Sequence, residues 1–377
     1  MNVLTLQQEL RDFAASIGVD KIGFTTAAPF VDLKHLLKQQ QELNYQSGFE
    51  EENIELRTEP TLLLEEAASI IAIAVAYPSR MENAPTGKKG ARRGIFCRAS
   101  WGTDYHTVLR EKLKEIEGFL VERVPGIKFR SMVDTGELVD RAVAERAGIG
   151  WSGKNCSIIT PEFGSYVYLG EMITNIPFAP DEAIEDQCGE CTLCIDVCPT
   201  GAIVQGGQLD SNRCVAFQTQ TKGFLPDEFR EKIGNRIYGC DTCQTVCPKN
   251  KGKKNWLHAA FEPEPELAKP LLAPLLSMTN KEFKSQFGHM SGSWRGKKPI
   301  QRNAIIALVH FKEEDAMPQL IELLTKDERP MIRGTAAWAI GKIAAAEAEE
   351  VLLAALQLEQ DPDVLNEIDK GLTLLKN

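Results

Sequence analysis

The chain has 377 residues, 43% of them hydrophobic and 25% charged, which is the balance of an ordinary globular protein with the length for two or three domains. Its longest apolar run, residues 68–77, is far shorter than the roughly 20 residues that a membrane helix needs. Residues 1–18 form an amphipathic pattern rather than a signal peptide, so we expect a cytoplasmic protein with no membrane contact. The net charge of −10 argues against nonspecific nucleic-acid binding by the whole surface.

Residues 1–180 alternate helical and strand patterns and predict one α/β domain. The apolar spacing predicts helices over 6–17 and 108–120, and strands near 22–24, 69–77, 127–133, 157–160 and 165–173. Residues 78–104 show neither period and are rich in Gly, Lys and Arg, as functional or disordered loops often are.

Residues 181–265 hold eight of the ten cysteines and are too polar and short to form a large apolar core. In a reducing compartment, such cysteines are better explained as metal ligands than as disulfides. Four of them, in "CGECTLCIDVCP" from residue 188, have the C-x2-C-x2-C-x3-C-P spacing of bacterial ferredoxins, in which the fourth cysteine ligates a second cluster. The alternative is zinc, which typically draws its cysteines as pairs from two separated knuckles.

This spacing predicts a ferredoxin-like module with two 4Fe-4S clusters, because "CDTCQTVCP" and one further cysteine bring the number of thiolates to eight. We assign one cluster to Cys188, Cys191, Cys194 and Cys247, and the other to Cys198, Cys214, Cys240 and Cys243. Two adjacent clusters indicate a protein that transfers electrons.

The C-terminal part of the chain contains a repeat. The segments "DERPMIRGTAAWAIGKI" and "EQDPDVLNEIDKGLTLL" align at an offset of 32 residues, and "KKPIQRNAIIALV" is a looser copy. Such periods are typical of solenoids of helical pairs, and the pattern resembles a HEAT repeat. The alternative is two unrelated helical hairpins.

A basic stripe precedes this repeat and enters it. Residues 249–302 contain eleven Lys or Arg against four Asp or Glu, whereas residues 303–377 contain seven against fourteen. The pattern favours RNA binding, since cations bind phosphates and aromatic rings stack on unpaired bases, although a solvated basic loop is the alternative. The candidate cations are Lys281, Lys284, Arg295, Lys297, Lys298 and Arg302, and the interleaved aromatic residues are Phe283, Phe287 and Trp294.

Three motifs of the α/β domain are "RTEP" (57–60), "GIFCRASWGTDYH" (94–106) and "SMVDTGELVDRAVAERAGIGWSGKNC" (131–156). Together with the double-cluster module, the basic linker and the repeat, they resemble the epoxyqueuosine reductase family over essentially the whole chain. The resemblance implies an oxidoreductase that reduces the epoxide of epoxyqueuosine, at the wobble position of certain transfer RNAs, in the last step of queuosine biosynthesis. Its cofactors would be cobalamin, whose cobalt(I) form attacks an epoxide carbon, and two 4Fe-4S clusters that feed it electrons.

The prediction is therefore an α+β multidomain protein. Residues 1–180 would form the cobalamin-binding α/β catalytic domain, 181–265 the ferredoxin-like domain with two 4Fe-4S clusters, and 266–377 a basic linker and HEAT-like repeat domain for transfer RNA. We also expect an electron donor such as a flavodoxin or ferredoxin, and a monomer.

Two alternative functions stay open. A reductive dehalogenase also joins cobalamin to two such clusters, but it usually carries a twin-arginine leader, which residues 1–20 lack. The other alternative is a noncatalytic electron-carrier subunit that docks through its HEAT-like repeat.

The resemblance assigns Asp134 as the proton donor to the epoxide oxygen. Burial beside the apolar corrin is expected to raise the pKa of Asp134 toward neutrality. From the residues alone, Asp134 and Glu137 instead have capping-box spacing ahead of a helix in 138–148. The acid and the cap are both kept as hypotheses.

Matching to the family also implies contacts with the corrin and the RNA. The implied corrin contacts are Arg57, Cys97, Asp134, Ile158 and Leu169, and the implied RNA contacts are Lys222, Lys281, Arg295, Lys297 and Lys298. The D-x-H-x-x-G signature of proteins that ligate cobalt through histidine is missed, since Leu109 replaces the glycine, so His106 is interpreted as a structural histidine. Cys156 is interpreted as a buried strand residue.

Overall fold

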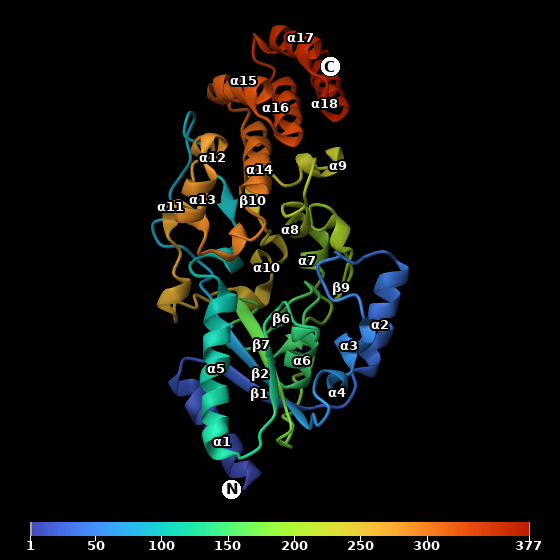
Figure 1. Ribbon diagram of the computed structural model, residues 1–377, viewed down its shortest axis with the longest axis vertical. Coiled ribbons are helices and arrows are strands. Elements are labelled where there is room, and N and C mark those ends of the chain that lie inside the picture. The colour runs from blue at the N-terminus through green and yellow to red at the C-terminus, as the bar shows by residue number, and fades with distance from the viewer. Residues whose placement is uncertain (1, 377) are drawn as a thin grey trace. The chain divides into compact units, whose positions relative to one another are not determined.

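The computed structural model describes residues 2–376 and divides the chain into two compact units, each assembled from several stretches of sequence (Figure 1). The first unit contains the residues up to Arg80, Gly102–Cys214 and Asp241–Glu262, and the second contains Met81–Trp101, Val215–Cys240 and the residues from Pro263 onward. These two units do not coincide with the three predicted domains, 1–180, 181–265 and 266–377. The roles assigned to those three domains remain a proposal.

The first unit is built on one antiparallel sheet. Its strand order is β1 (Lys21–Thr26), β2 (Ser69–Ala76), β7 (Val167–Thr174) and β4 (Phe129–Met132). All eight residues of β2 are buried, because α5 (Tyr105–Arg123) and α6 (Asp140–Arg146) cover opposite faces of the sheet (Figure 1). Side chains alternate between the faces, so the even-numbered residues of β2 share an apolar cluster with Val143 and Ala144 of α6.

Shorter elements complete the first unit. Its other helices are α1 (Val3–Ser16), α2 (Val31–Glu42), α3 (Ile54–Thr58), α4 (Pro60–Leu63), α7 (Leu193–Asp196) and α10 (Thr242–Thr245), with 3-10 turns at Ser211–Arg213, Pro248–Asn250 and Ala259–Phe261. Two small hairpins join β5 (Trp151–Ser152) to β6 (Ile158–Ile159), and β8 (Ile203–Gln205) to β9 (Gln208–Leu209). The helices and strands predicted in residues 1–180 are confirmed to within a few residues at each end.

The second unit is mainly helical. A short parallel pair joins β3 (Ile95–Phe96) to β10 (Arg236–Tyr238). Its helices are α8 (Val215–Gln218), α9 (Asp227–Arg230), α11 (Pro265–Ala268), α12 (Leu272–Ser277), α13 (Asn280–Phe287), α14 (Lys297–His310), α15 (Met317–Lys326), α16 (Pro330–Ile343), α17 (Ala348–Leu358) and α18 (Pro362–Leu375). Three 3-10 turns lie at Arg98–Ser100, Ser291–Ser293 and Glu314–Ala316.

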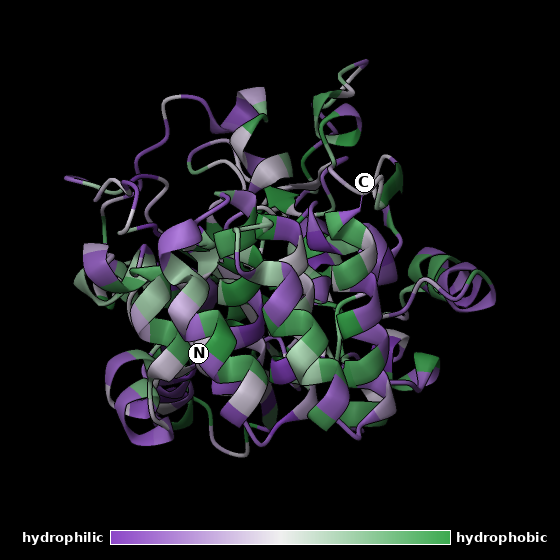
Figure 2. Ribbon diagram, turned by 90° about the horizontal axis from the view of Figure 1, so that it is seen from above, coloured by the Kyte–Doolittle hydropathy of each residue, from purple (hydrophilic) through white to green (hydrophobic). Residues whose placement is uncertain are grey.

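The predicted repeat is confirmed as α14, α16 and α18, which are separated by α15 and α17. Hydrophobic and hydrophilic residues are mixed along the helices of the molecule (Figure 2). Most residues of α14 and α16 are buried, whereas α18 buries Val364, Glu367, Ile368 and Gly371 and exposes other residues. The helices α16 and α18 approach each other closely at a pair of glycines, because a Cβ on Gly341 would lie 2.4 Å from the Cα of Gly371. Any larger residue at Gly341 would force these two helices apart.

Two expectations about local structure are wrong. The loop 78–104 contains β3 and the turn Arg98–Ser100, and the core of the second unit includes Phe96 and Trp101 from this loop. A two-residue strand is too short to show a period in the sequence. Cys156 is not in a strand: it lies in the turn between β5 and β6 with φ of 63°, where its N–H donates to the carbonyl of Gly153.

No helix in residues 2–376 has the length and apolar character needed to cross a membrane.

Candidate functional site

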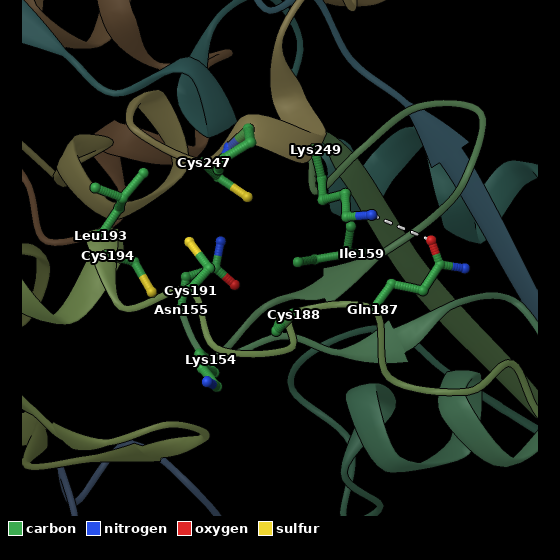
Figure 3. Close-up of a pocket in the computed structure, with 11 residues that line it drawn as sticks. Lys154, Asn155, Ile159, Gln187, Cys188, Cys191, Leu193, Cys194, Cys247 and Lys249 are labelled. Carbon is green, nitrogen blue, oxygen red and sulfur yellow. Dashed lines mark hydrogen bonds between the residues drawn. The ribbon is translucent and has the colours of Figure 1, made fainter.

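Four cysteines line a cavity of about 170 Å³ in the first unit. Three of them, Cys188, Cys191 and Cys194, come from one loop and the start of α7, and Cys247 comes from a second segment just after α10 (Figure 3). The sequence analysis assigned these same four residues to one cluster. Lys249 donates to Gln187 across the rim of the cavity, with an Nζ–Oε1 distance of 3.2 Å (Figure 3).

The chemistry of this cavity suits an iron-sulfur cluster. Its four thiols are the ligands that a 4Fe-4S cluster requires, and its wall also contains the apolar side chains of Ile159, Leu193 and Pro248. The loop is held in place by backbone hydrogen bonds, such as that from the N–H of Cys188 to Asp186 Oδ1 at 2.7 Å. The residues that line this cavity therefore fit a 4Fe-4S cluster.

The assignment of the other four cysteines, Cys198, Cys214, Cys240 and Cys243, rests on their spacing in the sequence. Within the first unit, the Sγ of Cys198 accepts the N–H of Ala202 at 3.3 Å, and the Sγ of Cys243 lies 4.0 Å from the carbonyl oxygen of Asn155. Both ligand sets remain proposals.

A second cavity in the first unit, of about 550 Å³, lies where β4 ends. It is lined by the turn that carries Asp134 and by three arginines, Arg57, Arg110 and Arg130. Its volume is within the range of roughly 300–1,000 Å³ that ligand and cofactor pockets occupy. Two of the predicted corrin contacts, Arg57 and Asp134, are thus brought to one cavity.

Asp134 lies in a tight turn and does not cap a helix. The helix α6 begins at Asp140, and the side chain of its N-cap residue, Val139, makes no capping hydrogen bond, so the capping hypothesis for Asp134 is wrong. The φ of Asp134 is 53°, in the left-handed region that Asp and Asn tolerate better than most residues. Its backbone N–H donates to Asp140 Oδ2 at 2.9 Å.

His106 contacts Asp134, which the interpretation of His106 as a structural histidine did not anticipate. At the start of α5, Nδ1 of His106 lies 2.7 Å from Asp104 Oδ1, and Nε2 lies 3.3 Å from Asp134 Oδ2. Tyr105 stacks on the imidazole with the ring centroids 4.1 Å apart, and it also hydrogen-bonds to Asp134. The carboxylate is therefore surrounded by groups that exchange or donate protons.

The contact sets the protonation of both groups. Burial opposes the charge on the imidazole, but the hydrogen bond to Asp104 and the close contact with the Asp134 carboxylate outweigh it and raise the pKa of His106 to about 9. The contact with His106 is the strongest influence on the carboxylate, and it lowers the pKa of Asp134. This is the reverse of the expected rise, and it means that near neutral pH the shared proton resides on His106.

The remaining predicted corrin contacts do not line the Asp134 cavity. Ile158 and Leu169 pack into the apolar cluster on the α6 face of the sheet. Cys97, in the second unit, is 9% exposed, and its N–H donates to the carbonyl of Tyr238 at 2.9 Å. Gly239 is required beside it, because a Cβ there would lie 2.3 Å from the Cys97 sulfur.

The predicted RNA contacts all lie in the second unit, but they differ in accessibility. Lys222, Lys281 and Lys298 are exposed. Lys297 is partly buried, which lowers the pKa of Lys297, and its Nζ donates to the carbonyl of Met278 at 2.6 Å. The guanidinium of Arg295 lies 4.1 Å from the centre of the neighbouring indole ring.

Part of the predicted basic and aromatic pattern is buried. Phe283 and Phe287 are 5% and 1% exposed and belong to the core, so of the three aromatic residues only Trp294, at 52% exposure, can stack on a base. Arg302 is fully buried, and its burial lowers the pKa of Arg302 to about 10.

Arg302 instead holds the turn that carries Lys222. Its guanidinium donates to the carbonyl oxygens of Gln218, Thr221 and Gly223, each at 2.9 Å. The inclusion of Arg302 among the RNA contacts is therefore wrong, because none of its donors is available to a phosphate.

Four thiols around one cavity and an acid–histidine pair beside another define the class of protein. The thiols place it among the iron-sulfur oxidoreductases, which transfer electrons.

The comparisons with known proteins identify the family. Family models match residues 187–250 (4Fe-4S double cluster binding domain), 57–135 (epoxyqueuosine reductase QueG, DUF1730) and 296–372 (HEAT repeats). A relative from Bacillus anthracis named epoxyqueuosine reductase is 66% identical over 375 residues, which cover 100% of this chain and 99% of the relative. The chain belongs to the epoxyqueuosine reductase family.

Two solved structures of the family are closely similar. An epoxyqueuosine reductase with an epoxyqueuosine-modified tRNA-Tyr stem loop has a TM-score of 0.98 and 65% identity, with all of both chains covered. An epoxyqueuosine reductase from Bacillus subtilis has a TM-score of 0.97 and 65% identity, covering 99% of this chain and 100% of its own, and its Asp134 catalytic loop is swung out of the active site.

Proposed function

We infer that this protein reduces the epoxide of epoxyqueuosine, at the wobble position of transfer RNA, to give queuosine in the last step of queuosine biosynthesis. The observation that carries this conclusion is the relationship to epoxyqueuosine reductases over the whole chain. The reaction consumes two electrons and two protons and releases the epoxide oxygen as water. The similarity to epoxyqueuosine reductases over the whole chain favours this function over the two alternatives, a reductive dehalogenase and a noncatalytic electron-carrier subunit.

The cofactors supply the electrons and the nucleophile. When bound, two 4Fe-4S clusters deliver single electrons and cobalamin provides a cobalt centre nucleophilic enough to open an epoxide. One cluster would be held by the four cysteines of the 170 Å³ cavity. The polar lining of the Asp134 cavity, with Arg57 as a donor, fits the amide groups at the edge of a corrin.

The protein itself supplies protons through Asp134 and His106. Opening the epoxide places negative charge on its oxygen, and Asp134, whose side chain is 59% exposed, can pass a proton from His106 to that oxygen. Asp104 accepts a hydrogen bond from Nδ1–H of His106, so the proton on Nδ1 stays in place. Nε2 is therefore the atom that exchanges a proton with Asp134. After His106 takes up another proton, the same pair can deliver the second proton, and the oxygen leaves as water.

The Bacillus subtilis structure supports this role for Asp134, because the loop it describes as catalytic carries an aspartate of the same number. The structure with the modified stem loop supports a transfer RNA substrate for this chain.

For RNA binding we predict that Lys222→Ala and Lys298→Ala each weaken affinity for a modified anticodon stem loop. Both lysines are exposed, and each lost phosphate contact should reduce the slope of log affinity against log salt by about one unit. Lys297→Ala should have a smaller effect, because that ammonium already donates to Met278. The measurement is fluorescence anisotropy at several salt concentrations.

A matched control is Lys326→Ala, since Lys326 is also an exposed lysine and forms an ion pair with Glu322 of its own helix. If Lys222→Ala and Lys298→Ala bind with the same salt slope as this control, the basic stripe is a solvated surface.

We further propose that the electron donor is a flavodoxin or ferredoxin, and that the protein works as a monomer in the cytoplasm. Two apolar side chains, Leu193 in the wall of the cysteine-lined cavity and Val197 directly after α7, are 45% and 41% exposed and provide a contact point for a small electron carrier. Sedimentation of the purified protein alone measures whether it is a monomer, and sedimentation with the carrier measures whether the two proteins bind.

Metal analysis after anaerobic purification tests the cofactor content. We expect about eight irons per chain, with cobalt present when cobalamin is supplied. Cys191→Ser and Cys243→Ser should each disrupt a different cluster, whereas Cys156→Ser should leave the iron content unchanged. Four irons, or stoichiometric zinc, in the unaltered protein would exclude the two-cluster account.

A further inference from the structure

Behind the turn that carries Asp134 lie two neighbouring carboxyl groups, the buried Glu171 and the partly buried Asp140, for which the reaction described above has no use. Glu171 is on β7, opposite Ala72 of β2 and Met132 of β4, and is 1% exposed. Its Oε1 has no hydrogen-bond partner. An acid in the middle of an apolar sheet is costly, so its presence requires an explanation.

Asp140 links this acid to the Asp134 turn. Asp140 is the first residue of α6, and its Oδ2 accepts the backbone N–H of Asp134 at 2.9 Å. Its carboxyl group also lies within hydrogen-bonding reach of Glu171. The three residues thus form one chain, from the sheet through the start of α6 to the turn.

Two neighbouring carboxyl groups do not ionise together readily, because their charges repel, and Glu171 is also shielded from water. Burial, together with the charge of Asp134, raises the pKa of Asp140 to about 6. Burial and the neighbouring Asp140 raise the pKa of Glu171 well above its usual range. The proton therefore belongs on Glu171.

We propose that Glu171 stays protonated and donates to Asp140, and that this pair fixes the backbone of the turn so that Asp134 faces both His106 and the cavity. Asp140 and Glu171 are then positioning residues for proton transfer. The proposal deepens the proposed function and rests on Asp134 as the acid.

The pair is expected to favour activity over stability. Replacing a buried polar group by an apolar one of similar size is often neutral or stabilising, and Ala72 and Ile173, on the same side of the sheet as Glu171, belong to the apolar cluster. If Glu171 contributed only to the stability of the fold, a leucine at this position would stabilise the sheet more than the glutamate does.

The test compares Glu171→Gln with Glu171→Leu in the full-length, cofactor-loaded protein. Glutamine keeps an N–H that can donate to Asp140, so its turnover should stay within about twofold of the unaltered protein. Leucine cannot donate, so turnover should fall at least about tenfold with an unchanged KM for the RNA, while the unfolding temperature stays the same or rises. Glu117→Gln is the matched control, because Glu117 contacts β4 through Ser131 and lies outside the pair.

A second readout does not depend on turnover. Infrared spectra at neutral pH should contain the carbonyl stretch of a buried protonated carboxyl group, which Glu171→Gln removes and Glu117→Gln leaves in place. Absence of this band in the unaltered protein, or its persistence in Glu171→Gln, would overturn the proposal, as would unaltered turnover in Glu171→Leu.

If Glu171→Leu does not fold, Asp140 provides the alternative test. Asp140→Asn keeps an acceptor for the Asp134 N–H and should remain active, whereas Asp140→Ala removes it and should lose at least about tenfold in turnover. Equal turnover of the two variants would overturn the proposal. Failure of the proposed function is distinguishable, because Asp134→Asn would then retain full activity while the infrared band still depended on Glu171.

Discussion

Asp134→Asn is expected to lower the rate of epoxide reduction by roughly two to four orders of magnitude, the usual contribution of a general acid. Asparagine has the same size, tolerates the φ of 53°, and keeps the backbone N–H that donates to Asp140. It cannot release a carboxyl proton, so the proton on His106 loses its route to the substrate. The measurement is a single-turnover rate with modified transfer RNA under anaerobic conditions.

The control for this variant is that cluster content, cobalamin binding and RNA affinity remain unchanged. A nuclear magnetic resonance titration of His106 provides a direct check, because losing one of its two carboxylate partners should lower the pKa of His106 from about 9. A rate above about a tenth of that of the unaltered protein, with chemistry as the slow step, would reject Asp134 as the acid.

Glu367→Ala is expected to lower the free energy of unfolding of the second unit by about 3–5 kcal/mol, the range found when one partner of a buried ion pair is removed. Arg230 of α9 and Glu367 of α18 are 3% and 5% exposed in their side chains, and they form two hydrogen bonds of 2.5 and 2.8 Å. The guanidinium also lies 5.0 Å from the centre of the Trp338 ring of α16. Without Glu367, a buried cation keeps only the largely exposed Asp227 as a counter-charge.

Urea unfolding followed by tryptophan fluorescence measures this effect. The matched control is Glu322→Ala, which removes a glutamate whose pair with Lys326 is 64% and 73% exposed. That substitution should change the free energy by no more than about 0.5 kcal/mol. Equal effects of Glu367→Ala and Glu322→Ala would show that the buried pair does not hold α9 to the repeat.

The sequence was sufficient for features that depend on neighbours along the chain. The continuous apolar run of β2 and the helical period of α5 are visible in the sequence, and the repeat in α14, α16 and α18 is visible as an alignment. The cysteine spacing led to a set of four residues that the fold places around one cavity.

The partners of Asp134 could not be predicted, because the fold brings them together from distant positions. His106 is on α5, and Glu171 is on the strand paired with β4. Only the sheet order and the packing of α5 place these groups near one turn. The capping hypothesis failed for a local reason, since Asp134 itself has a left-handed backbone and α6 starts later, at Asp140.

The RNA surface was overestimated because residue type alone does not reveal which face of a helix is exposed. Phe283 and Phe287 are four residues apart in α13, so they lie on one face, and that face is the buried one. Arg302 in α14 has the charge of an RNA contact, but it is buried and binds carbonyl groups. The helical period of these positions was available in the sequence and would have favoured the core.

The central claim is tested most directly by identifying the product. Purified protein carrying its clusters and cobalamin is incubated without oxygen with epoxyqueuosine-containing transfer RNA and a one-electron reductant, and the nucleosides are then analysed by mass spectrometry. The account predicts conversion of epoxyqueuosine to queuosine, a nucleoside lighter by one oxygen atom, and its loss in Asp134→Asn. Epoxyqueuosine left intact by protein with full iron and cobalt content and bound RNA would contradict it.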